Sequence, residues 1–86
     1  MISNPSQTLN VNIRSRKKNF FTGKTFSVTS INNKGEFDIL PLHANFISLI
    51  KNYVILSKGT ENEQKFALST GVLRVKENRV DVFLDV

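Results

Sequence analysis

The sequence predicts an all-β fold, a β-sandwich or barrel of short strands, and three observations predict it. Apolar and polar residues alternate with a period of two in several short runs, as in strands with one buried face. Turn-forming segments separate these runs, a spacing typical of sandwiches and barrels. The chain has 86 residues, which is enough for one domain with one shared core.

The alternating runs can be followed in order along the chain. Their apolar positions are Leu9, Val11 and Ile13; Phe26 and Val28; Val54 and Leu56; Phe66 and Leu68; and Val80, Val82, Leu84 and Val86. The turn signals are residues 32–35, 59–62 and 76–78. The one helical feature expected is a turn at Ala44–Ile50. Residues 1–7 are expected to form a flexible tail, so that residues 8–86 make the domain.

A single core is expected from the apolar positions of these runs and their neighbours. The side chains predicted to be largely buried in it are Leu9, Val11, Ile13, Val28, Phe37, Ile39, Phe66, Leu68, Leu73, Val80 and Val82.

The positive charge is uneven along the chain. Residues 1–35 hold six Lys/Arg and no acid, whereas residues 36–86 hold six Lys/Arg and seven acids, so the first segment supplies all of the net +5. The densest part is Arg14–Lys18. A basic stretch of this kind can attract anionic lipid headgroups, acidic loops or nucleic acid.

The composition argues against an enzyme. There is no cysteine, and His43 is the only histidine, which excludes thiol chemistry and His-His metal pairs. No Gly-rich phosphate loop and no metal-ligand spacing occurs, so neither a cofactor nor a metal is expected. No apolar run approaches the roughly 20 residues of a membrane helix. The first residues do not resemble a signal peptide, so the chain is expected to work in the cytosol or at a membrane surface.

A nucleic-acid site is the second function considered. Arg14–Lys18 is followed by Phe20 and Phe21, and small barrels bind single strands through a basic groove with stacking rings. The alternative is a solvated hairpin tip followed by two phenylalanines that belong partly to the core. We favour the hairpin tip and expect no nucleic-acid binding. A free-standing β-sandwich module with a basic end, binding single-stranded nucleic acid, is kept as the alternative function.

The segment Gly35–Asn45 has the properties of a strand followed by an exposed loop. Phe37 and Ile39 alternate toward one face, and Pro41 ends the strand because proline cannot donate to a sheet ladder. The segment is either an edge strand with a corner or a loop that presents Glu36 and His43 to a partner.

This segment resembles a family. Its sequence, GEFDILPLHAN, is similar to the G-E-[FL]-G-I-[LY]-P-G-H-A-P segment of the epsilon subunit of F-type ATP synthases. Residues 21–28, 66–75 and 78–85 resemble the family's F-x-G and V-x-S-V strand, its A-[VL]-S-G-G-[FI]-L-E-V strand pair and its last strand. The resemblance covers residues 8–86 in order. It departs from the pattern at Asp38, Leu42, Asn45, Thr70 and 51–53.

The resemblance implies a flattened sandwich of two five-stranded antiparallel sheets, about ten short strands in all. It implies a non-catalytic rotor subunit of the central stalk, which contacts the gamma subunit and the c-ring. Such a subunit is peripheral to the membrane, on the cytoplasmic face of a bacterial inner membrane. The family usually continues after the last strand with a helical hairpin that regulates ATP hydrolysis, and this chain stops there, either naturally or by truncation.

The resemblance also implies site residues. Glu36 and His43 match the family's motif and are expected to face the c-ring from one end of the sandwich. The gamma-facing positions are placed near residues 66–75, at Phe66, Ser69, Gly71 and Val72.

Overall fold

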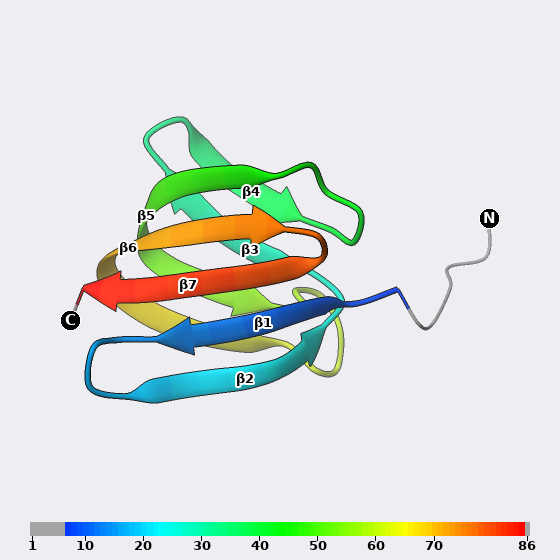
Figure 1. The fold of residues 1–86 in the computed structure, drawn as a ribbon, viewed down its shortest axis with the longest axis horizontal. Helices are drawn as coiled ribbons and strands as arrows, with labels where there is room; N and C mark the ends of the chain where they lie inside the picture. Colours follow the sequence, from blue (N-terminus) through cyan, green and yellow to red (C-terminus); the bar gives the residue numbers. More distant parts are fainter. Residues whose placement is uncertain (1–6, 86) are drawn as a thin grey trace.

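The computed structural model describes residues 7–85, and this part of the chain consists of seven β-strands without a helix (Figure 1). Residues 1–6 of the tail predicted at 1–7, and the strand position predicted for Val86, lie outside the described residues. The strands are β1 (Leu9–Arg14), β2 (Asn19–Thr25), β3 (Val28–Asn32), β4 (Gly35–Ile39), β5 (Phe46–Leu56), β6 (Gln64–Lys76) and β7 (Arg79–Asp85).

The strands form one hydrogen-bonded sheet in the order β2-β1-β7-β6-β5-β3-β4. Neighbouring strands are antiparallel except β1 and β7, which run parallel with Val11 opposite Val80. This parallel pair joins the two ends of the described chain in the middle of the sheet. The all-β class predicted from the alternation is confirmed.

The prediction of about ten strands in two antiparallel sheets is wrong in its details. β5 has 11 residues and β6 has 13, and each continues through a register shift between Lys51 and Asn52. Asn52 has a φ of 70°, in the left-handed region that asparagine tolerates better than most residues. A bulge bends and twists a strand without ending it, so these two strands pass from one layer to the other. The helical turn predicted at Ala44–Ile50 is also wrong, because β5 begins at Phe46.

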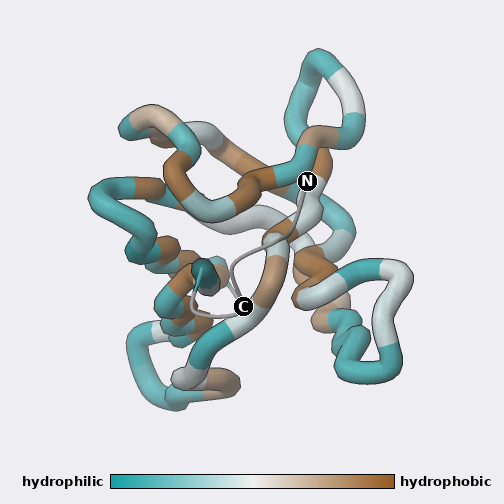
Figure 2. The backbone as a smooth tube through the Cα atoms, turned by 90° about the vertical axis from the view of Figure 1, so that its right-hand side faces the viewer, coloured by the Kyte–Doolittle hydropathy of each residue, from teal (hydrophilic) through white to brown (hydrophobic). Residues whose placement is uncertain are grey.

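The sheet curls around a single core, with β3 passing behind β6 and β7 in Figure 1. The buried apolar cluster draws side chains from six strands, all except β2, and Phe21 of β2 packs against its edge. Of the side chains predicted to be buried, all are buried except three that are half-buried and pack against the cluster: Phe37, Phe66 and Leu68. Figure 2 shows the same arrangement from the side, with hydrophilic loops extending from the bundle of strands.

Two tight turns of two residues each lie at the ends of the sandwich. Asn33 and Lys34 join β3 to β4, where the Lys34 amide donates to Asn32 Oδ1 at 2.8 Å. Glu77 and Asn78 join β6 to β7, both with positive φ, as in the two-residue turns that match the twist of a hairpin. The Asn78 carbonyl accepts a 2.8 Å hydrogen bond from the amide of Asn10, so this turn also anchors the start of β1.

Candidate functional site

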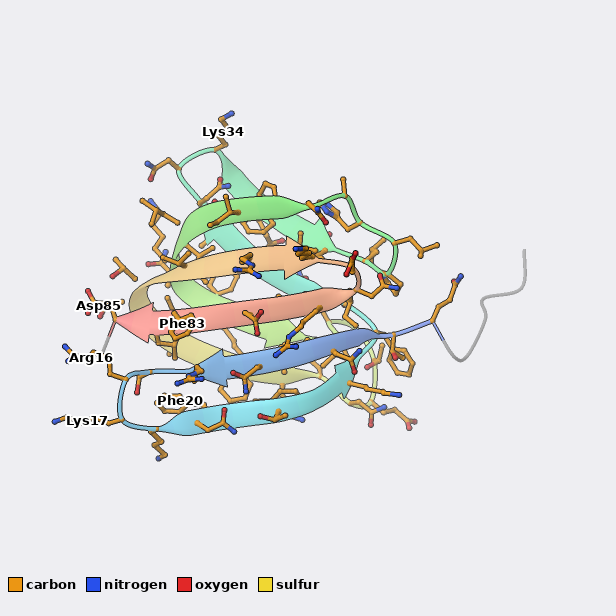
Figure 3. All side chains as sticks on the ribbon, in the orientation of Figure 1. Arg16, Lys17, Phe20, Lys34, Phe83 and Asp85 are labelled. Atoms are coloured by element: carbon orange, nitrogen blue, oxygen red, sulfur yellow. The ribbon has the colours of Figure 1, made fainter. Side chains whose placement is uncertain are left out.

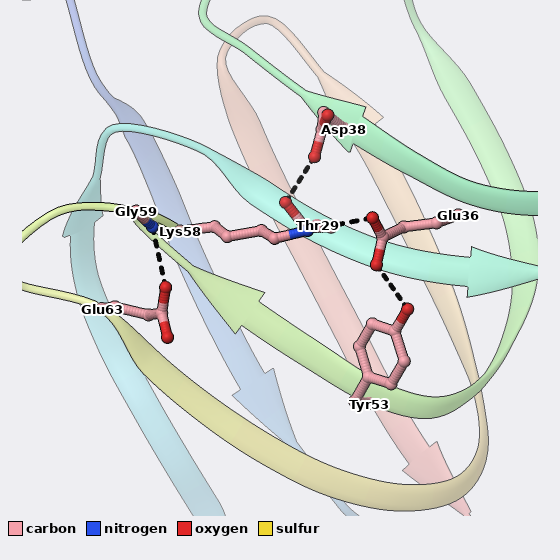
Figure 4. Close-up of polar contacts among 7 residues, drawn as sticks. All are labelled: Thr29, Glu36, Asp38, Tyr53, Lys58, Gly59 and Glu63. Atoms are coloured by element: carbon pink, nitrogen blue, oxygen red, sulfur yellow. Dashed lines mark hydrogen bonds and ion pairs between the residues drawn. The ribbon is translucent and has the colours of Figure 1, made fainter.

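Glu36 lies on β4, and its carboxylate is held by one side chain of β5 and one of the β5–β6 loop (Figure 4). The Tyr53 hydroxyl donates to Glu36 Oε2 at 2.5 Å, and Lys58 Nζ lies 3.0 Å from Oε1. The Lys65 ammonium sits 5.0 Å from the centre of the Tyr53 ring, a cation–π contact. Glu36 was predicted to be an exposed carboxylate, and its side chain is 41% exposed.

These contacts keep Glu36 ionised. The hydrogen bond from Tyr53, followed by that from Lys58, holds the pKa of Glu36 below its ordinary value. The same hydrogen bonds raise the pKa of Tyr53 and the pKa of Lys58, since both stabilise the protonated donor. A carboxylate has about four lone-pair positions and two are used here, so Glu36 can still accept hydrogen bonds from outside the chain.

His43 lies in the loop of residues 40–45 between β4 and β5, which we call the proline loop. Its Nδ1 is 2.7 Å from the Ala44 carbonyl oxygen, and its ring meets the ring of Phe46 edge to face at 5.8 Å. The amide of His43 donates to the Leu40 carbonyl oxygen at 3.1 Å, which closes the loop into a turn. His43 is half-buried, so one side of its imidazole faces the protein and the other can meet a partner.

The proline loop presents apolar side chains to solvent. Leu40 is 55% exposed and Leu42 is 72% exposed. Leu42 has a φ of 69°, a left-handed conformation that costs about 1–2 kcal/mol for a residue with a Cβ. Its amide donates to Asn78 Oδ1 at 2.6 Å, which helps to hold that conformation. A strained, exposed leucine in a braced loop is typical of a contact surface.

Glu36 and His43 were expected at the same end of the sandwich, but they flank β4 from opposite ends. Glu36 is the second residue of β4, next to the turn that Figure 3 marks with Lys34, whereas His43 follows four residues after the last residue of the strand. The Glu36 side chain nevertheless points along the sheet to Lys58, which follows the far end of β5. A single partner would have to span this face to contact both.

The four positions predicted on β6 separate into two pairs. Phe66 is half-buried, and its ring meets Phe21 edge to face at 6.2 Å, so it belongs to the core edge. Gly71 is buried, and a Cβ there would lie 2.6 Å from the Phe83 carbonyl oxygen. Ser69 and Val72 are exposed. Ser69 and Val72 are therefore the two of these four residues most open to direct contact with a partner.

The basic segment forms the tip of the β1–β2 hairpin. Arg16, Lys17 and Lys18 are exposed at this tip, and Phe20 beside them is 36% exposed. Phe21 points the other way, into the core edge. The hairpin tip is confirmed, but only one of the two phenylalanines expected to belong partly to the core does so, Phe21, and the ring of Phe20 is left on the surface.

Sequence reasoning missed the partners of Glu36. Tyr53 is 17 residues away and Lys58 is 22 residues away, so no local motif connects them. The strand order β5-β3-β4 brings them together, and the sequence contains no signal for that order. Asn78, which braces Leu42 from 36 residues away, was missed for the same reason.

Within residues 7–85, no three acidic or histidine side chains gather closely enough to hold a metal ion. The same part of the chain offers no helix with the length and apolarity that a membrane span requires.

The comparisons with known proteins agree on one family. The sequence matches the family described as the ATP synthase, Delta/Epsilon chain, beta-sandwich domain over residues 8–86. An ATP synthase epsilon chain of Clostridium novyi (strain NT) is 30% identical over 83 residues, which is 93% of this chain and 62% of that protein. The ATP synthase epsilon chain 2 of Paraburkholderia xenovorans (strain LB400) is 48% identical over 44 residues, 50% of this chain and 32% of that protein. The chain thus spans less than two thirds of the length of either relative.

Two solved structures have a similar fold. A chain of the Euglena gracilis mitochondrial ATP synthase, in an OSCP/F1/c-ring structure, superposes with a TM-score of 0.81 at 14% identity, covering 95% of this chain and 53% of that one. A chain of the Tetrahymena thermophila mitochondrial ATP synthase, in a structure of the central stalk and c-ring, superposes with a TM-score of 0.73 at 15% identity. This match covers 91% of the present chain and 63% of the Tetrahymena chain. At such identities these similarities concern the fold alone.

Proposed function

This chain belongs to the family of ATP synthase delta/epsilon chain β-sandwich domains, and from this membership we propose that it is a non-catalytic subunit of the rotary central stalk of a proton-translocating F-type ATP synthase. The observation that carries the proposal is the family match, which runs from residue 8 to residue 86 and so includes all seven strands. The 30% identity to a bacterial epsilon chain over nearly the whole chain supports it.

The proposed partners are the gamma subunit and the c-ring, and the proposed location is the cytoplasmic face of a bacterial inner membrane, peripheral to it. The two similar folds come from an OSCP/F1/c-ring structure and a central stalk/c-ring structure. In this role the subunit binds and transmits motion, and catalysis belongs to other subunits. A sheet whose two longest strands are shared by both layers suits a part that must keep its shape under torque, because the layers cannot slide apart without breaking strands.

Glu36 is the proposed polar contact to the c-ring. Its exposed carboxylate is preorganised by Tyr53 and Lys58, so it loses little side-chain freedom when a cationic or amide donor of a ring loop binds. Such exposed charges mainly set the orientation and the rate of association.

His43 and the proline loop are the proposed second contact to the c-ring. The apolar side chains of Leu40 and Leu42 can bury against the partner. Nε2 of His43, whose Nδ1–H faces the Ala44 carbonyl oxygen, can accept a hydrogen bond at the edge of that contact. The hydrogen bond from Leu42 to Asn78 ties this loop to the β6–β7 turn, so a force on the loop reaches the centre of the sheet.

The proposed gamma contact is the exposed side of β6. Ser69 and Val72 would touch gamma, while Phe66 and Gly71 would act by shaping the strand from the core side.

A binding experiment tests the proposal. The chain is mixed with the gamma subunit and the purified c-ring of the ATP synthase from the same cell, and co-elution is measured by size-exclusion chromatography. We expect the chain to elute with gamma and the ring. Elution of the wild-type chain alone, in the presence of both partners, would contradict the proposed function.

Matched charge variants test the orientation. Glu36→Gln and Glu61→Gln each remove one negative charge from an exposed side chain. We expect Glu36→Gln to weaken ring binding and Glu61→Gln, in the β5–β6 loop, to leave it unchanged. Loss of ring binding with Glu61→Gln but not with Glu36→Gln would show that a different face meets the ring.

A further inference from the structure

A cleft of ≈ 1240 Å³ opens at the end of the sandwich where the β1–β2 hairpin tip, the last residues of β7 and the bend of β5 and β6 meet. We call it the hairpin-end cleft. Figure 3 shows this end, with Arg16, Lys17 and Phe20 on one side, Phe83 and Asp85 beside them, and Lys34 on the β3–β4 turn above. The segments that line the cleft meet at the other end of the molecule from the proline loop, as the positions of the strands and turns in Figure 1 show.

One wall of the cleft carries a row of apolar side chains. Leu49 of β5 pairs with Val72 of β6, and Val72 pairs with Phe83 of β7, so the three lie side by side across adjacent strands. They are 75%, 36% and 49% exposed, respectively. Phe20, which also lines the cleft, extends the apolar surface onto β2. A contiguous row of exposed apolar residues on a sheet face marks an interaction site.

The rim of the cleft is positively charged. Four cationic residues line it against the single acid Asp85: Arg16, Lys17, Lys18 and Lys51. Neither of the two ion pairs found within residues 7–85 involves any of these cations. Their charge is therefore available to a partner and favours one that carries negative charge.

The hairpin tip holds its cations in place. The Ser15 amide donates to the Lys18 carbonyl oxygen at 2.8 Å, and the amide of Lys18 donates to Ser15 Oγ at 3.2 Å. Ser15 itself is 8% exposed. The backbone at the rim is thus ordered before a partner arrives, which lowers the entropic cost of binding.

From this combination we propose that the hairpin-end cleft binds an acidic amphipathic helix of a partner protein. The apolar face of the helix lies on the row Leu49, Val72 and Phe83, and its carboxylates meet Arg16, Lys17 and Lys18. The proposal follows from the lining of the cleft alone and does not rest on the proposed function. The one residue that it shares with the proposed gamma contact is Val72, which can meet only one of the two partners at a time.

A helix fits better than an extended peptide because of the strand order. Val72 and Phe83 lie where β6 and β7 have paired strands on both sides, whereas Leu49 lies in the part of β5 that pairs with β6 alone. An extended peptide could therefore add a strand only beside Leu49, at one edge of the row, and its backbone could not pair over Val72 and Phe83. A helix satisfies its own backbone hydrogen bonds and needs only an apolar groove with a polar rim.

The size of the cleft agrees with a short helical segment. A helix of 10–12 Å diameter and 5.4 Å pitch occupies roughly 400–600 Å³ per turn, so the cleft holds about two to three turns. A membrane surface fits less well, because the apolar row lines a concave space instead of projecting beyond the charged tip.

The test uses the whole chain and a fluorescent acidic peptide of about 12 residues, three helical turns, with leucine at i, i+3 and i+4 spacing and glutamate elsewhere. Binding is followed by fluorescence anisotropy at several salt concentrations. A peptide with lysine in place of every glutamate is the charge control, and vesicles rich in anionic phosphatidylglycerol are the lipid control. We expect the acidic peptide to bind, and added salt to weaken its binding.

Two pairs of variants locate the site. Lys17→Glu and Leu49→Ser change the rim and the apolar row, and each is expected to weaken binding about tenfold. Lys76→Glu alters the net charge equally at the opposite end of β6, and Ile47→Ser, which is 67% exposed, alters the same strand and face outside the cleft. Both are expected to bind within about twofold of the wild-type chain.

Several outcomes would overturn the proposal. Equal binding of the acidic and the lysine peptide would show that the cationic rim does not select the partner. Equal effects of Leu49→Ser and Ile47→Ser would show that the peptide does not bind in the cleft. Binding to anionic vesicles without binding to the acidic peptide would assign this end to a lipid surface. Binding of neither probe would also refute it. None of these results depends on gamma or on the c-ring, so they stand apart from the test of the proposed function.

Discussion

Replacing Gly71 with alanine should destabilise the sandwich through a single steric contact. Gly71 pairs with Leu84 of β7, and a Cβ added at Gly71 would lie 2.6 Å from the Phe83 carbonyl oxygen, under the 3.0 Å below which real Cβ contacts essentially never occur. The obstacle is backbone, so it cannot rotate away as a side chain would. Overpacking of this kind costs about 1–3 kcal/mol, a large part of the roughly 5–15 kcal/mol that stabilises a typical domain.

The measurement is urea unfolding followed by far-ultraviolet circular dichroism, which reports the strands directly in a chain without tryptophan. For a domain of this size each kcal/mol also lowers the melting temperature by about 4–8 °C. Ser69→Ala is the control, because Ser69 is exposed two residues earlier on the same strand and should change stability by less than about 0.5 kcal/mol. If Gly71→Ala unfolds at the same urea concentration as Ser69→Ala, the close approach of β6 and β7 at this point is refuted.

Three further variants have definite expected outcomes. Leu73 is fully buried, so Leu73→Ala should cost about 2–5 kcal/mol in the same urea assay, and a variant as stable as the wild type would contradict its place in the core. Leu42→Gly should raise stability by about 0.5–1 kcal/mol, since relief of the left-handed strain exceeds the added entropy of glycine; a lower melting temperature would refute the strain. Glu36→Gln should lower the pKa of Tyr53 toward its ordinary value in an ultraviolet titration of the phenol. The pKa of Glu36 is lower in the folded chain than its ordinary value of 4.5, so ionised Glu36 stabilises the fold above pH 4.5. This stabilisation is lost as the pH falls through the lower folded-state pKa. The free energy of unfolding of Glu36→Gln should therefore fall less steeply with decreasing pH in this acid range.

The buried faces were predictable because period-two alternation is local. In residues 9–13 and 80–84 the alternate positions predicted to face inward are apolar, and the structure confirms their burial for Leu9, Ile13 and Val82, while Phe83 lies on the outer face. The exception is instructive. Phe66 and Leu68 face the core but are only half-buried, and after the register shift the inward positions of β6 change to Gly71, Leu73 and Val75.

The candidate site was only partly predictable. The family motif identified Glu36 and His43, and the structure shows that they flank β4 from opposite ends. It also supplies partners that the motif does not contain, Tyr53 and Lys58 for Glu36 and Asn78 for the proline loop.

The sequence by itself determined the all-β class, the register of the inward faces, the basic hairpin tip and the family, because each depends on neighbouring residues or on a motif read along the chain. Only the tertiary structure decided the strand count, since β5 and β6 continue through the shift at Lys51 and Asn52 where a local reading expects separate strands. The hairpin-end cleft could also be found only in the tertiary structure, because its lining comes from five segments of the chain between residues 15 and 85. The physical reason is the same in both cases: strand order and sheet curvature are fixed by the burial of a shared core, and that burial joins residues far apart in the sequence.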